Sequence, residues 1–189
     1  MKLLHVLAGA SLTMLLGPVT TLAGSYPQKH HGFFFGFNAG GGVASVRYTA
    51  TGDTDRQPGG AINFRLGGSV ANNVLLGAEF TGWTREQNGR PVGVGSALFA
   101  LTYFPVGGFF IRGGTGFGTT QFLEKAPNGS VGLTGEVGVA FGGAAGYEWR
   151  LTKSFALGYQ MEFNWINVGG ELVDKASYAA ASLGFNWYW

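Results

Sequence analysis

The 189-residue sequence contains no cysteine, little charge and, past its N-terminal segment, no long apolar run. The absence of cysteine excludes a disulfide framework and thiolate metal sites. Without an apolar run of about 18 residues, the chain offers no candidate transmembrane helix. Twelve Lys and Arg are balanced by ten Asp and Glu, with no basic cluster or RNA-binding motif. Nucleic acid is therefore excluded as a partner.

Glycine and aromatic residues are abundant instead. The chain holds 35 Gly, 16 Phe, 7 Tyr and 5 Trp. Glycine without a regular proline period is not collagen-like, and this aromatic content argues against disorder. The composition therefore favours a folded protein with many small and many very large side chains.

The N-terminal segment has the layout of a secretory signal peptide. A short basic start, Met1-Lys2, is followed by the apolar stretch from Leu3 to Leu16 and by the small-residue site Thr21-Leu22-Ala23. That stretch is too short to span a bilayer as a helix. We expect cleavage after Ala23, a periplasmic leader over residues 24–31, and a single domain over residues 32–189.

Large apolar residues alternate with small or polar ones along the rest of the chain, which is typical of strands with two different faces. Eight such segments can be drawn, at about residues 32–48, 61–71, 74–84, 92–104, 109–122, 135–149, 154–167 and 176–189. Both faces of the fourth segment are apolar, and we assign Phe99, Leu101 and Tyr103 to its large face. The connections alternate between brief turns and longer polar loops, a pattern typical of an outer-membrane barrel.

Two architectures fit eight alternating strands. In a soluble barrel or sandwich the large apolar face points inward, whereas in a membrane barrel it points outward into lipid. The small face here is mostly Gly, Ala, Ser, Thr and Asn, which suit the crowded interior of a narrow barrel but would weaken a water-facing strand. The large face carries more aromatic volume than such an interior holds. The sequence therefore predicts an all-β fold: a closed eight-stranded antiparallel up-and-down transmembrane β-barrel with short periplasmic turns and longer extracellular loops.

The whole mature chain resembles the small outer-membrane β-barrels of diderm bacteria, a group that includes OmpX, the OmpA transmembrane domain and the opacity proteins. Two stretches carry the resemblance: the hairpin sequence from Gly146 to Phe155, and the last strand. The resemblance implies that a terminal strand ending in an aromatic residue is read by the barrel-assembly machinery. The residues in this position are Leu183, Phe185, Trp187 and Trp189, with Trp in place of the usual Phe.

Charged residues on the small face form the first candidate site, a lumen charge network. Its expected members are Arg65, Glu79, Arg112, Glu136, Glu148 and Glu162. Charges in a narrow lumen are costly unless they are paired. We expect Arg65 to lie one step out of register with Glu79, within side-chain reach, and Arg112 to pair with Glu148. Such a network either plugs the barrel or lines a small pore that prefers cations, because its acidic groups outnumber its basic ones.

Aromatic residues of the large face cluster at the strand ends that meet at the short turns. They are expected to form an interfacial girdle, made of Phe33, Tyr103, Phe109, Tyr147, Trp149, Phe155, Trp187 and Trp189.

Catalysis is not expected. Lipid-modifying enzymes of this architecture need a His with a Ser at the loop rim, and the only mature histidines, His30 and His31, precede the first strand. We interpret them as part of a solvated leader, with no metal and no cofactor.

The sequence therefore predicts a non-catalytic outer-membrane protein with a structural or surface-interaction role. Its expected partners are outer-membrane lipid, lipopolysaccharide and the assembly machinery, together with a surface ligand that the sequence does not identify. The alternative is a narrow channel or small-solute binder that uses the lumen.

Overall fold

The structure, a computed structural model, describes residues 29–87, 90–125 and 131–189. The expected signal peptide and most of the leader lie outside the described residues. Nine strands are present: β1 (Phe33–Tyr48), β2 (Gly52–Asp53), β3 (Gln57–Ala71), β4 (Val74–Gln87), β5 (Arg90–Val106), β6 (Phe109–Lys125), β7 (Val131–Arg150), β8 (Phe155–Asn167) and β9 (Val173–Tyr188). No helix in the described part of the chain is long and apolar enough to cross a membrane.

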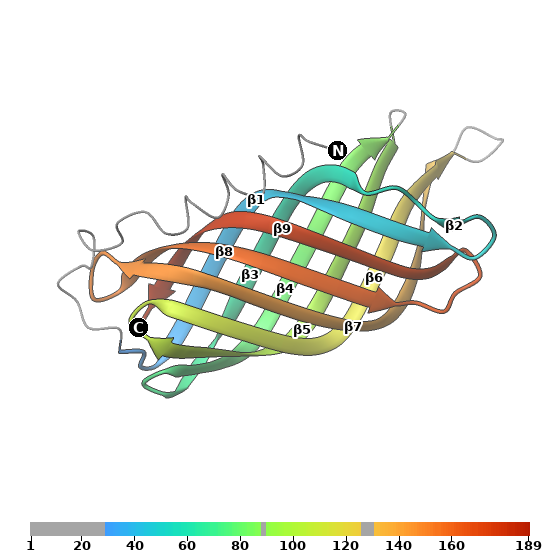
Figure 1. The fold of residues 1–189 in the computed structure, drawn as a ribbon. Coiled ribbons are helices and arrows are strands. Elements are labelled where there is room, and N and C mark those ends of the chain that lie inside the picture. Colours follow the sequence, from blue (N-terminus) through green and yellow to red (C-terminus); the bar gives the residue numbers. More distant parts are fainter. Residues whose placement is uncertain (1–28, 88–89, 126–130) are drawn as a thin grey trace, which may run out of the picture.

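The eight long strands close into one barrel (Figure 1). Each pairs antiparallel with its neighbour in the order β1, β3, β4, β5, β6, β7, β8, β9. The barrel is completed by β1 with β9, whose pairing extends from Phe34 opposite Tyr188 to Tyr48 opposite Val173. The short strand β2 pairs antiparallel with the end of β1 and forms a hairpin with it. The predicted closed antiparallel eight-stranded barrel is confirmed.

The barrel has two different rims. At one, here called the turn rim, short connections join β3 to β4, β5 to β6 and β7 to β8. The loop rim at the other end carries β2 and the connection from β8 to β9. Several strands are longer than expected at this end: β7 begins at Val131 rather than near residue 135, and β6 continues to Lys125. Backbone pairing continues there through Lys125 opposite Val131, beyond the alternation from which the strand bounds were predicted.

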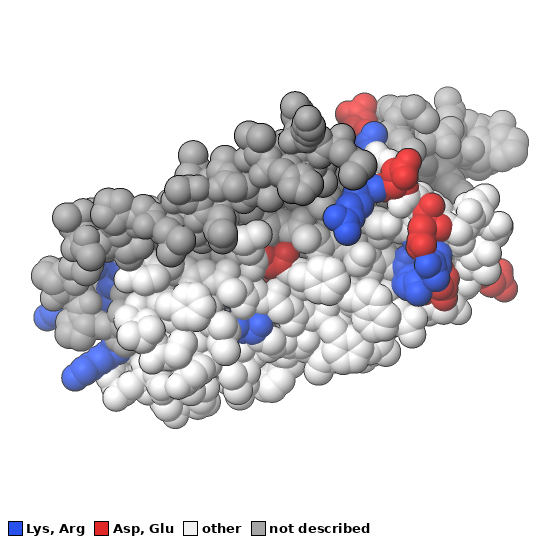
Figure 2. Space-filling view, in the orientation of Figure 1, with Lys and Arg blue, Asp and Glu red and all other residues white. Residues whose placement is uncertain are grey.

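The polarity of the barrel wall is inverted relative to a soluble protein. Large apolar side chains point outward and are exposed, including Ile62, Phe80, Phe99, Phe117, Val137, Phe141, Met161, Phe163 and Leu183. Leu101 and Tyr103 are also exposed, which confirms the phase chosen for the fourth strand. In Figure 2 the visible wall between the rims is almost uncharged; Lys and Arg gather at both ends, and Asp and Glu mainly at the end that carries the loops. Such a wall matches lipid rather than water.

Candidate functional site

The lumen is filled in layers. At the turn rim an apolar layer consists of Phe34, Leu75, Phe104, Phe110, Ala156 and Tyr188. Towards the loop rim a larger apolar layer includes Trp83, Val94, Leu98, Ile166 and Tyr178. Buried polar side chains lie between them. Phe104 and Phe110 lie at strand ends that were expected to belong to the outer girdle, but they point inward because each follows an outward residue in its strand.

The polar layer is held together by an ion pair between two strands that are not direct neighbours, β4 and β6. Arg112 Nη2 on β6 lies 2.8 Å from Glu79 Oε1 on β4, and both side chains are almost fully buried. Arg112 also donates to Gln160 Oε1 at 3.0 Å. Asn63 donates to Glu79 and, at 3.0 Å, to Glu162 Oε2. Each charge is therefore compensated by a partner from another strand, as burial requires.

Two further groups extend the polar layer in both directions. Towards the turn rim, Arg65 donates to Asn186 at 2.6 Å, and Asn186 donates to Glu148 at 3.2 Å. Towards the loop rim, four side chains form a closed ring of hydrogen bonds, made of Thr81, Ser96, Asn164 and Tyr178. The hydrogen bonds thus link side chains around the lumen instead of lining an open path.

The expected register of the charges needs a correction. Arg65 and Glu79 are direct cross-strand partners, not one step out of register, because an irregularity between Ser69 and Ala71 shifts the β3–β4 pairing by one residue. The ion pair of Glu79 is formed with Arg112, for which we expected Glu148 as the partner. Glu148 instead accepts hydrogen bonds from Asn186 and Tyr188.

The expected excess of acidic groups in the lumen is also wrong. Glu136 is not in the lumen layer but at the loop rim, where its carboxylate accepts hydrogen bonds from the backbone N–H groups of Leu172 and Val173. Arg150, expected in a turn, is buried, and its guanidinium lies 4.2 Å from the ring centroid of Tyr188. Among the described residues, the buried Arg and Glu side chains are therefore equal in number: Arg65, Arg112, Arg150, Glu79, Glu148 and Glu162.

His30 is the main feature that the sequence analysis missed. It was expected in a solvated leader, yet its side chain is fully buried in the turn-rim mouth. Its ring stacks on Phe104 at 4.1 Å between centroids, and its Nε2 atom lies 3.9 Å from Glu148 Oε1. Backbone and side-chain bonds to Asn72 O, both 3.1 Å, hold it there. His31, by contrast, is exposed.

Neighbouring contacts fix the leader beside His30. Arg150 donates to Lys29 O at 2.8 Å, and Ser69 donates to His30 O at 2.7 Å. The leader therefore closes the turn-rim mouth as a cap attached to both β3 and β7. A signal was present in the sequence: aromatic neighbours such as Phe33-Phe34 and Phe109-Phe110 place one ring on each face. They therefore predict an aromatic mouth into which another ring can pack.

All eight residues of the expected girdle lie at the turn rim and none of them is buried. Several form ring contacts along the rim: Phe155 with Trp187 at 5.3 Å, Tyr147 with Trp149 at 5.1 Å, and Phe33 with Trp189 at 5.9 Å. The outward residues of the last strand pair with β1, where Phe35 lies opposite Trp187 and Phe37 opposite Phe185. Leu183 lies opposite Ala39 in the same register.

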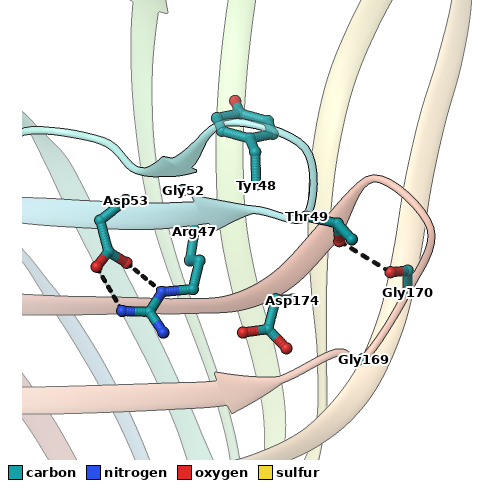
Figure 3. Close-up of a pocket in the computed structure, with 8 residues that line it drawn as sticks. All are labelled: Arg47, Tyr48, Thr49, Gly52, Asp53, Gly169, Gly170 and Asp174. Atoms are coloured by element: carbon teal, nitrogen blue, oxygen red, sulfur yellow. Dashed lines mark hydrogen bonds and ion pairs between the residues drawn. The ribbon is translucent and has the colours of Figure 1, made fainter.

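A cleft of about 560 Å³ opens at the loop rim (Figure 3). It lies between the β1–β2 hairpin and the β8–β9 connection and is lined by Arg47, Tyr48, Thr49, Gly52, Asp53, Gly169, Gly170 and Asp174. Arg47 forms a two-bond ion pair with Asp53, through Nε at 2.6 Å and Nη2 at 2.5 Å. The guanidinium lowers the pKa of the Asp53 carboxyl, and the carboxylate raises the pKa of Arg47.

Ion pairs between Arg and an acidic residue are therefore found both in the lumen, as Arg112–Glu79, and in the loop-rim cleft, as Arg47–Asp53. No group of three or more potential metal ligands occurs among residues 29–87, 90–125 and 131–189.

A closed eight-stranded barrel with an apolar exterior and an interior filled by polar and apolar layers defines a small transmembrane β-barrel of the outer-membrane type. Among solved structures, the chain is similar to Neisserial surface protein A, with a TM-score of 0.62 and 15% identity, covering 83% of this chain and 97% of that one. It is also similar to Ail of Yersinia pestis, with a TM-score of 0.54 and 14% identity, covering 82% and 99%. No family model matches the chain, and no curated protein is significantly similar to it.

Proposed function

We propose that the chain is a non-catalytic protein of the bacterial outer membrane, in which a barrel closed to solutes carries a surface that interacts with external molecules. The observation that supports a closed barrel is the sequence of layers in the lumen. A solute would have to pass the Trp83 layer, the Arg112–Glu79 layer and the Phe104 layer, then the His30 cap. Each layer is packed or hydrogen-bonded across the lumen, which fits a structural plug better than a pore.

The proposed partners follow from the wall and the last strand. Exposed residues such as Phe117 and Leu183 contact the acyl chains of lipid and lipopolysaccharide. The girdle residues lie at the turn-rim interface, where aromatic side chains are favoured. Leu183, Phe185, Trp187 and Trp189 serve as the signal for the assembly machinery. The absence of catalysis is supported by the position of His30, which is buried at the rim opposite the loops.

The surface role is proposed for the loop rim. Another similar structure of Ail is a complex with the heparin analogue sucrose octasulfate, at a TM-score of 0.51 and 15% identity to this chain. A highly sulfated ligand is not favoured here, because Arg47 is already neutralised by Asp53 and a second carboxylate, that of Asp174, lines the same cleft.

Planar-bilayer conductance of the refolded mature protein tests the closed barrel. We expect no discrete openings, and we expect none after Glu79→Gln, because the layers above and below remain. The double variant Leu98→Ala with Ile166→Ala is the matched control, because it removes side-chain volume from the apolar layer towards the loop rim and leaves the charged groups unchanged. It separates an effect of looser packing on conductance from an effect of the charge at position 79. Discrete openings in the unmodified protein, with an ion preference that shifts in Glu79→Gln, would favour the alternative of a narrow channel.

A further inference from the structure

We propose that the loop-rim cleft binds a neutral saccharide, whose hydroxyl groups bridge the Arg47 guanidinium and the Asp174 carboxylate. This inference rests on the proposed surface role and names its class of ligand. The volume of about 560 Å³ is within the roughly 300–1,000 Å³ typical of small-molecule pockets.

Asp174 is placed by an irregularity in the sheet. Arg47 pairs with Lys175 and Tyr48 pairs with Val173, so that Asp174 is the extra residue of a bulge in β9. Bulges of this kind redirect a side chain and are common next to binding sites. In Figure 3 the Asp174 carboxylate lies on the same side of the strands as Arg47 and is directed towards the cleft. Among the described residues, no group donates a hydrogen bond to this carboxylate.

Arg47 supplies the complementary group. Its bonds to Asp53 use Nε and one hydrogen of Nη2, and a guanidinium carries five N–H donors in total. Donors on Nη1 and Nη2 therefore remain for an acceptor in the cleft. A sugar hydroxyl both donates and accepts. Neighbouring hydroxyls of one ring can therefore donate to Asp174 and accept from Arg47 at the same time.

The charge of the cleft disfavours other ligands. Two carboxylates and one guanidinium line it, and Lys175, the register partner of Arg47, acts electrostatically on Asp53. These charges balance, so the cleft has no excess positive charge to hold an anion. A divalent cation would need several oxygen ligands on one side. Here the guanidinium of Arg47 is paired with one carboxylate, Asp53, and interacts electrostatically with the other, Asp174. A neutral ligand with many hydroxyl groups needs neither an excess positive charge nor a set of free oxygen ligands.

Contacts between the two loops hold the cleft open before any ligand arrives. Thr49 donates to Gly170 O at 3.1 Å, and Thr49 N donates to Leu172 O at 3.0 Å. The carboxylate of Glu136 fixes the same connection from the neighbouring β7, by bonds of 3.0 and 2.7 Å. A ligand therefore does not have to order these loops, a cost that often weakens binding.

Nuclear magnetic resonance of the full mature chain in phospholipid nanodiscs tests the proposal. Maltose and N-acetylglucosamine are titrated, and the amide shifts of Gly52, Gly169 and Gly170 are followed. We expect saturable shifts with at least one sugar and about tenfold weaker binding in Asp174→Asn, which loses a charge-assisted hydrogen bond but keeps the shape. Asp55→Asn is the matched control, because the Asp55 carboxylate is exposed and lies outside the cleft. This variant should bind the sugar as tightly as the unmodified protein does.

Three comparison ligands and a second membrane complete the test. Shifts caused only by a heparin disaccharide, ethanolamine or Ca²⁺ would overturn the proposal, as would equal binding by Asp174→Asn or no shift with either sugar.

Arg47→Lys keeps the charge but loses the two-bond geometry, so it should also weaken binding of the sugar. In discs containing lipopolysaccharide, the same shifts without added sugar would assign the saccharide to the membrane's own glycolipid. Conductance plays no part in this readout, so the cleft and the closed barrel can fail independently.

Discussion

Glu79→Gln is the most direct test of the lumen network. The substitution keeps the size of the side chain and its ability to accept from Asn63, but it removes the charge opposite Arg112. Both partners are almost fully buried, and breaking a buried ion pair typically costs about 3–5 kcal/mol. Because Gln160 still accepts a hydrogen bond from Arg112, we expect the lower end, about 3 kcal/mol.

Equilibrium urea unfolding in lipid vesicles, followed by tryptophan fluorescence, measures this loss. Glu86→Gln is the matched control, because Glu86 lies on the same strand but is exposed, and its cost should stay within about 0.5 kcal/mol. The double variant Glu79→Gln with Arg112→Met should lose less free energy of unfolding than the two single variants lose together, because it leaves neither charge of the pair without its partner. A loss below about 1 kcal/mol in Glu79→Gln would refute the view that the ion pair holds this layer together.

Three further predictions address other parts of the barrel. His30→Ala should lower stability by about 2–3 kcal/mol and speed hydrogen exchange at the turn rim, while a thermal shift no larger than that of an exposed substitution would argue against the cap. On β6, Gly116→Ala should cost about 1–3 kcal/mol in urea unfolding, because a Cβ there meets the backbone of β5. Gly113→Ala, whose Cβ would have no neighbour within 4 Å, should be neutral. The lowered pKa of Asp53 means that its ion pair is intact above the ordinary aspartate range and is lost only as the pH falls through the lowered value. Carbon-13 titration should show this low midpoint, and Arg47→Ala should raise it.

The fold was predictable because lipid and lumen impose opposite demands on alternate residues. From Phe155 to Trp165 every second side chain is large and points outward, so the pattern alone determined which face of the strand belongs to the apolar wall. It did not determine the register, which the irregularity between Ser69 and Ala71 shifts by one residue between β3 and β4. The same reasoning failed at the loop rim, where β7 extends to Val131 beyond the alternating stretch. Backbone hydrogen bonds between neighbouring strands continue there without any requirement on side-chain pattern.

The candidate sites were less predictable, because they depend on contacts across the barrel. Alternation correctly indicated that Glu79 and Arg112 point inward, but their pairing crosses an intervening strand and cannot be read from sequence neighbours. Glu136 has the same inward parity, yet it lies beyond the filled part of the lumen and bonds to a loop. The burial of His30 depends on a mouth formed by several strands at once.

The pairing of β1 with β9 has a consequence for when the cleft comes into existence. Arg47 and Asp53 belong to the first hairpin, whereas Asp174 belongs to the last strand, and the Thr49–Gly170 bond joins positions 121 residues apart. The cleft therefore straddles the seam at which the barrel closes, and contacts of such sequence separation are expected to form late in folding. An unclosed sheet would possess every individual strand but no cleft. Saccharide binding would then report the fraction of molecules that have completed assembly.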